Sequence, residues 1–189
     1  MTARSGKEGC AVTRTTHRLA LDAMLSAMFV VLSLISISLP NMKITLDALP
    51  VLVAAVLLGP LDGLCVGLAG SFLNQLLTYG LGPTTILWII PAGVRGLLVG
   101  LYARHHDFEL TKRQLLWITI STALLVTALN TLFMYFDSRI IGYPFAATLP
   151  TVFFRILAGV LTSIAFSLIL PGIVKALKKI SQSPGSTGN

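Results

Sequence analysis

The sequence predicts an all-α integral membrane protein: a bundle of six transmembrane helices with both termini in the cytoplasm. Of its 189 residues, 54% are hydrophobic and only 11% are charged, whereas an ordinary soluble domain carries about 25% charged residues. The apolar residues fall into six stretches, which approach the roughly 20 residues that a spanning helix needs. The basic residues gather on one side of the resulting topology. This composition excludes a soluble enzyme or a soluble nucleic-acid-binding protein.

The N-terminal part of the chain predicts a tail and two helices. Residues 1–18 are polar and predict a disordered basic tail. The first apolar stretch, 19–39, is longer than the 7 to 15 apolar residues of a cleaved signal peptide, so we expect a retained helix. The second stretch, 44–59, is short and runs into the turn-forming sequence Gly-Pro-Leu-Asp-Gly at 59–63.

Four further spans follow, divided by breaker residues and by a charged loop. The third runs from the turn to about residue 79, and Gly-Leu-Gly-Pro at 80–83 separates it from the next. The fourth, fifth and sixth cover about 84–103, 114–136 and 149–174. The membrane domain then spans 19–176, and the basic, Ser/Gly-rich residues 177–189 predict a second disordered tail.

The distribution of basic residues predicts the topology. Six spans put both termini on one side, and ten of the fourteen Lys and Arg residues lie in segments on that side. These are Arg4, Lys7, Arg14, Arg18, Arg104, Lys112, Arg113, Lys175, Lys178 and Lys179. Only Lys43 and Arg139 lie in outer loops. Basic residues collect in cytoplasmic loops, so the termini are predicted to be cytoplasmic.

Polar side chains from four spans predict a binding pocket in the outer third of the membrane. A polar group in hydrocarbon usually faces a cavity, a partner or a ligand, and depth follows from a rise of about 1.5 Å per residue. Aromatic walls with a few polar groups are typical of small-molecule pockets. Tyr79 and Tyr135 could instead be interfacial aromatic residues. The predicted substrate-binding residues are Asn74, Gln75, Tyr79, Thr85, Trp88, Asn130, Tyr135, Phe154 and Arg155.

Two arginines lie within predicted spans. Arg155 keeps its charge at any accessible pH and so needs an anion. That anion is either Asp47 or a carboxylate of the ligand, and the sequence leaves both open. Arg95 is deeper and is expected to be structural, paired with Asp62; the alternative is that it lines the floor of the cavity.

Small residues recur at helical spacing in three spans, which permits close approach of helices in lipid. Those of the first span lie at its cytoplasmic end and predict a docking surface for a partner subunit; they are Ala20, Ala23 and Ala27. The glycines of the third and fourth spans predict packing inside the bundle; they are Gly59, Gly63, Gly67, Gly93, Gly96 and Gly100.

Motifs for chemistry are absent from the sequence. It holds no P-loop and no H-E-x-x-H, and no Ser or Cys lies beside an intramembrane base. The two cysteines, Cys10 and Cys65, have no C-x-x-C spacing. We therefore expect no enzymatic activity, no cofactor and no metal site.

The six short spans, the Ala23-x-x-x-Ala27 pair and the outer polar pocket resemble the substrate-binding S component of an energy-coupling factor (ECF) vitamin transporter. The likeness covers residues 19–176 and is carried by the stretches 44–50, 58–63 and 83–97. It implies a multi-pass protein of the bacterial plasma membrane that binds a vitamin from outside. It also implies docking through Ala23 and Ala27 onto a transmembrane coupling subunit that works with two cytoplasmic ATPase subunits. The loop 39–44, with Asn41 and Lys43, would form part of a lid.

The pocket residues favour an anionic vitamin, with folate first and pantothenate second. Trp88, Phe153 and Phe154 offer stacking for a flat ring, while Asn74 and Asn130 offer amide pairing. A second hypothesis is a small self-sufficient channel or exporter that works as an oligomer, which glycine stripes and six helices also suit. An intramembrane enzyme would need an acid/base pair or a nucleophile that the sequence does not show.

Overall fold

The structure is a computed structural model that describes most of the chain. Its backbone is described for residues 3–35, 37–39, 42–108, 110–142, 144–145 and 149–182. Side chains are described for 16–35, 45–108, 110–142, 144–145, 150 and 152–176.

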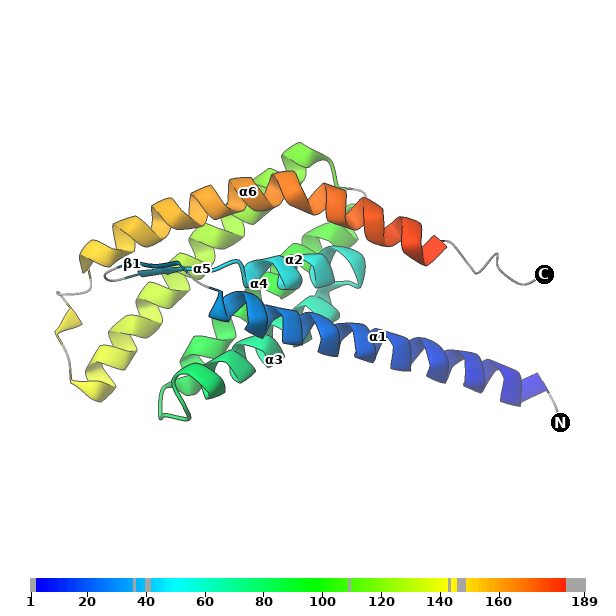
Figure 1. The fold of residues 1–189 in the computed structure, drawn as a ribbon, viewed down its shortest axis with the longest axis horizontal. Coiled ribbons are helices and arrows are strands. Elements are labelled where there is room, and N and C mark those ends of the chain that lie inside the picture. Colours follow the sequence, from blue (N-terminus) through cyan, green and yellow to red (C-terminus); the bar gives the residue numbers. More distant parts are fainter. Residues whose placement is uncertain are drawn as a thin grey trace.

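The described residues form six helices and one short hairpin (Figure 1). In chain order they are α1 (Ala3–Leu34), β1 (Ile37–Leu39), β2 (Met42–Ile44), α2 (Ala48–Leu57), α3 (Pro60–Thr78), α4 (Thr85–His105), α5 (Lys112–Ile141) and α6 (Leu149–Gln182). The start of α1 and the end of α6 both extend beyond the bundle at the same end (Figure 1). This arrangement agrees with an even number of spans.

Four helical segments among the described residues are long and apolar enough to cross a membrane. They are Thr16–Leu34, Thr85–His105, Lys112–Ile141 and Val152–Ala176. Helix α2 is apolar but short. The structure therefore supports a multi-pass membrane protein, while the count of six spans and the cytoplasmic location of the termini stay predictions.

The structure differs from the sequence expectation at the chain ends and after α1. Helix α1 begins at Ala3, so most of the segment 1–18 continues the helix. Helix α6 likewise runs on to Gln182. Hydropathy marks where a helix enters lipid, and a polar helix beyond that point leaves no such signal.

The antiparallel hairpin takes the place of the end of the predicted first span, 19–39, and of the predicted loop 39–44. It pairs Ile37 with Ile44 and Leu39 with Met42. Of the predicted lid residues, Asn41 lies outside the described residues, as does the side chain of Lys43. Three-residue strands are too short to leave a readable alternation in the sequence.

Glycine and proline set the helix boundaries that matter for the bundle. Gly59 has a φ of 122°, a conformation that favours glycine, and the proline at the first position of α3 follows it directly. A capping box of Thr111 and Gln114 starts α5. Gly142, with a φ of 90°, ends α5 in a left-handed cap.

Helices α3 and α4 are in backbone contact through their glycines. A Cβ placed on Gly67 would lie 2.5 Å from the carbonyl oxygen of Ala92, and one on Gly63 would lie 2.9 Å from that of Gly96. A Cβ on Gly96 would overlap the carbonyl oxygen of Gly63. The predicted role of these glycines in internal packing is confirmed, because no side chain fits between the two helices.

The apolar core surrounds α2. Residues 51–56 of this helix are buried, and Leu52 and Val53 pack with Val99 of α4 and Leu170 of α6. Helix α2 contacts α1, α3, α4 and α6. Because α2 has only ten residues, it fills one part of the bundle and leaves space beyond its N-terminal end.

Candidate binding cavity

A cavity of about 700 Å³ lies in the space beyond the N-terminal end of α2. This volume falls within the range of about 300 to 1,000 Å³ that is typical of small-molecule sites. All six helices contribute to its wall: Phe29, Ser33 and Leu34 from α1, Thr45, Asp47, Ala48 and Val51 at α2, Ser71, Asn74, Gln75, Thr78 and Tyr79 around α3, Trp88, Pro91, Ala92 and Arg95 from α4, Val126, Thr127 and Asn130 from α5, and Arg155, Ala158, Gly159, Thr162 and Phe166 from α6.

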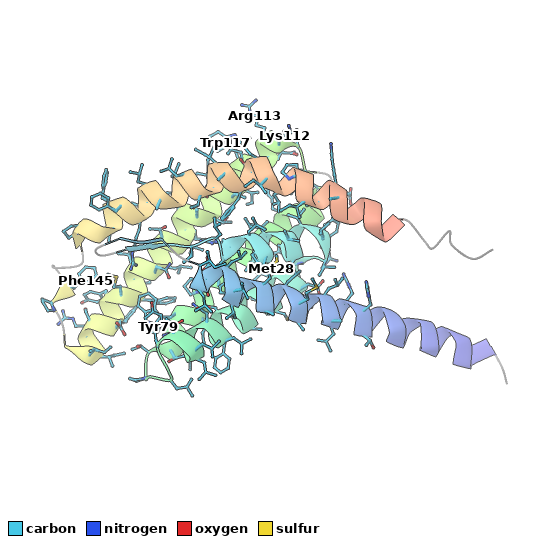
Figure 2. The ribbon with its side chains drawn as sticks, viewed as in Figure 1. Met28, Tyr79, Lys112, Arg113, Trp117 and Phe145 are labelled. Carbon is cyan, nitrogen blue, oxygen red and sulfur yellow. The ribbon has the colours of Figure 1, made fainter. Side chains whose placement is uncertain are left out.

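Each long helix turns a single face toward the cavity. The lining residues of α3, α4 and α6 recur at intervals of three and four, the spacing of one helical face. Figure 2 shows Tyr79 at the end of the molecule away from the chain termini, the end at which Phe145 also lies. Tyr79 is 64% exposed and lines the cavity, so the mouth of the cavity faces that end.

Six of the predicted substrate-binding residues line the cavity. They are Asn74, Gln75, Tyr79, Trp88, Asn130 and Arg155. Their types supply what the sequence predicted for a pocket: amide groups, aromatic rings and a cation.

Hydroxyl groups hold the amide of Asn74 in place. Thr78 Oγ1 donates to Asn74 Oδ1 at 3.2 Å, and Ser33 Oγ lies 2.7 Å from the same oxygen. Ser71 Oγ donates to the carbonyl oxygen of Trp88 at 3.3 Å and so joins α3 to α4 within the wall. A carboxamide fixed through its oxygen presents its amide nitrogen as a donor for a ligand.

Three predicted residues lie outside the lining of the cavity. Thr85 is buried, and its Oγ1 accepts a hydrogen bond of 2.8 Å from the backbone nitrogen of Gly82, so it stabilises the turn before α4. Tyr135 accepts a hydrogen bond of 3.1 Å from Arg139 through its hydroxyl group. Phe154 is 54% exposed and contacts Phe153 edge to face. Depth along a helix was the predictive criterion, and depth does not specify which face a residue occupies.

Neither of the two ion pairs that the sequence left open is formed by the described residues. Within the described part of the chain, no ion pair joins Asp47 to Arg155; Asp47 accepts a hydrogen bond of 2.9 Å from Thr45 Oγ1. Asp62 pairs with Arg18 of α1 at 3.3 Å instead of with Arg95. Arg95 lines the cavity, the alternative that the sequence had left second.

Sequence reasoning missed the small hydroxyl residues of the wall. Thr127 lies three residues before Asn130, and Thr162 lies seven residues after Arg155, so both share the face of a predicted residue. That helical spacing was a signal that could have found them. The other hydroxyl residues of the wall that are not in the predicted set are Ser33, Thr45, Ser71 and Thr78.

The alanines predicted to dock a partner lie on the outer surface of α1. Ala20, Ala23 and Ala27 are all exposed. The cavity-lining Phe29 and Ser33 are buried on another face of the same helix. Within the described residues, nothing covers this stripe of small side chains.

Residues 17–180 match the family model described as the ECF transporter, substrate-specific component. Among curated proteins, the chain is similar to UPF0397 proteins of Streptococcus pneumoniae. Those of serotype 19F (strain G54) and strain 70585 are each 39% identical over 83 residues, which is 42% of this chain. The aligned part spans 44% of the length of these relatives.

Two solved structures share the fold. One is the S component of a bacterial ECF transporter, with a TM-score of 0.66 and 23% identity over 87% of this chain and 99% of that one. The other is the S component for biotin from an ECF-type ABC transporter, with a TM-score of 0.60 and 18% identity over 88% and 93% of the two chains. At these identities the likeness extends to the fold.

Proposed function

The chain belongs to the family of ECF transporter substrate-specific components, and from this premise we propose that it captures an anionic water-soluble vitamin for import across the bacterial plasma membrane. Members of this family are substrate-binding subunits of transporters, not enzymes. The family also favours such a subunit over a self-sufficient channel or exporter.

The cavity is the observation that supports capture of a small polar molecule. It combines about 700 Å³ of space with amides at positions 74, 75 and 130, the indole of Trp88 and the guanidinium groups of Arg95 and Arg155. Polar and charged groups within the membrane are costly unless they face a ligand or a water-filled space. A ligand with hydrogen-bonding groups and a carboxylate matches this lining.

Folate is the first candidate and pantothenate the second. The rings of Trp88 and Tyr79 can stack on a flat pterin, and the wall amides can pair with its edge. Pantothenate needs fewer aromatic contacts and uses the amides and a guanidinium. Phe153 and Phe154 do not support the choice of folate, because both are exposed and neither lines the cavity.

Transport would require partners that hydrolyse ATP, because this chain has no P-loop. We propose a transmembrane coupling subunit with two cytoplasmic ATPase subunits. The exposed stripe of Ala20, Ala23 and Ala27 supports α1 as the docking helix, since small side chains allow a second helix to approach closely.

A thermal-shift panel on the purified protein tests this proposal. The panel comprises folate, pantothenate, biotin and other water-soluble vitamins. A ligand at 100 times its dissociation constant stabilises the folded state by about 2.7 kcal/mol. We expect a clear rise in the unfolding temperature with an anionic vitamin. If no vitamin in the panel raises it, the proposed function is wrong.

A further inference from the structure

Arg95 occupies the middle of helix α4. The helix spans Thr85–His105, so Arg95 lies about 15 Å from either end. A guanidinium group keeps its charge at any accessible pH. A charge near the middle of a transmembrane span is costly and usually marks a pathway or a ligand site.

Among the described residues, Arg95 has no direct anionic partner. Its side chain is only partly buried and lines the cavity. Within the described residues, no carboxylate lies within 4.0 Å of it, and it makes no hydrogen bond to a protein group. Asp47 is the acidic side chain that lines the same cavity, and Thr45 already donates a hydrogen bond to that carboxylate.

We infer that Arg95 binds the carboxylate of the captured vitamin on the floor of the cavity, and that Asp47 opposes this binding. The inference rests on the proposed function and assigns an orientation to the ligand. Trp88 lies seven residues nearer the mouth on the same face of α4, about 10 Å from Arg95. The acidic end of the ligand then lies deep, and its other end lies beside Trp88 and Tyr79.

The charge of the cavity agrees with a single deep carboxylate. Its charged lining residues, within the described chain, are Asp47, Arg95 and Arg155. They carry one net positive charge, which one carboxylate neutralises.

Titration of the purified protein with folate, pantothenate and pantothenol tests the inference. Pantothenol is the uncharged alcohol that corresponds to pantothenate. We expect Arg95→Gln to weaken binding of the anions about 10- to 100-fold, the effect of losing a hydrogen bond between charged groups. Pantothenol binding should change less than about threefold. Arg155→Gln is the same substitution in the same cavity. It should weaken binding of the anions less than Arg95→Gln does.

Asp47→Asn provides a test of opposite sign that does not depend on the folding of the Arg95 variant. Removing the opposing carboxylate should strengthen binding of the anions severalfold. Weaker binding in Asp47→Asn would show that Asp47 and Arg95 form a structural pair. That result overturns the inference. The inference is also overturned if Arg155→Gln lowers the affinity for the anions as much as Arg95→Gln does, or more. A wild type that binds no vitamin of the thermal-shift panel contradicts the proposed function itself. A wild type that binds an anionic vitamin, with unaltered affinity in Arg95→Gln, contradicts this inference alone.

Discussion

The contact between α3 and α4 predicts a specific loss of stability in Gly96→Ala. An added Cβ would overlap the carbonyl oxygen of Gly63, whereas ordinary contact requires at least 3.4 Å. The two helices therefore have to separate by about an ångström, and overpacking of this kind typically costs about 1 to 3 kcal/mol. The same substitution also removes a flexible glycine from a helix, which contributes up to about 1 kcal/mol in the stabilising direction.

Gly172→Ala on α6 isolates the packing cost. A Cβ at Gly172 meets nothing within 4 Å, so this variant reports only the helix-propensity gain. The free energy of unfolding, measured in mixed micelles with increasing dodecyl sulfate, should be about 1 to 3 kcal/mol lower for Gly96→Ala than for Gly172→Ala. Gly63→Ala should show a similar loss, because its Cβ would lie 2.8 Å from that of Ala55. Equal free energies of unfolding for Gly96→Ala and Gly172→Ala would refute backbone contact between α3 and α4.

Other substitutions separate the roles of individual side chains. Ala23→Trp should abolish vitamin uptake in cells that carry the coupling and ATPase subunits but leave binding to the purified protein unchanged, because Ala23 is exposed and lies outside the cavity lining; lost binding would assign it to internal packing. Trp88→Ala should lower affinity for a ring-bearing vitamin by about 0.5 to 1.5 kcal/mol through lost stacking. Phe154→Ala should not alter that affinity, since Phe154 is outside the cavity lining; comparable losses would contradict the assigned wall. Arg18→Gln should lower the free energy of unfolding by less than about 1 kcal/mol, because the Arg18 side chain is 56% exposed. A larger fall in the free energy of unfolding would show that the ion pair with Asp62 contributes substantially to the packing of α1 in the bundle.

The sequence predicted the boundaries of α3 and α4 well because breaker residues surround them. Pro60 begins α3, and the Gly80–Pro83 stretch separates it from α4. The start of α1 could not be predicted in the same way. Its first turns are polar, so no apolar periodicity distinguishes them from a tail.

Residues of the candidate cavity wall were predicted from their depth in the membrane. The prediction differs from the structure where the position of a side chain around the helix axis decides whether it lines the cavity. Asn74 and Gln75 were found because they share the height and the face of the cavity. Phe154 has the height of Arg155 but is its chain neighbour, turned by about 100° around the helix axis. The role of Arg95 depends on Asp62 pairing with Arg18, a feature of the tertiary structure that the sequence does not show.

Equilibrium binding to a version of the protein with a filled cavity tests the central claim most directly. Thr162 lines the cavity, and its hydroxyl group donates to the backbone carbonyl of Ala158 at 2.8 Å, so Thr162→Phe fills space without removing a contact to another helix. Leu161→Phe is the matched control on the 59% exposed adjacent position. The account predicts one vitamin per chain for the wild type and for Leu161→Phe, and at least tenfold weaker binding for Thr162→Phe. Unchanged binding in Thr162→Phe would show that the vitamin lies somewhere other than this cavity.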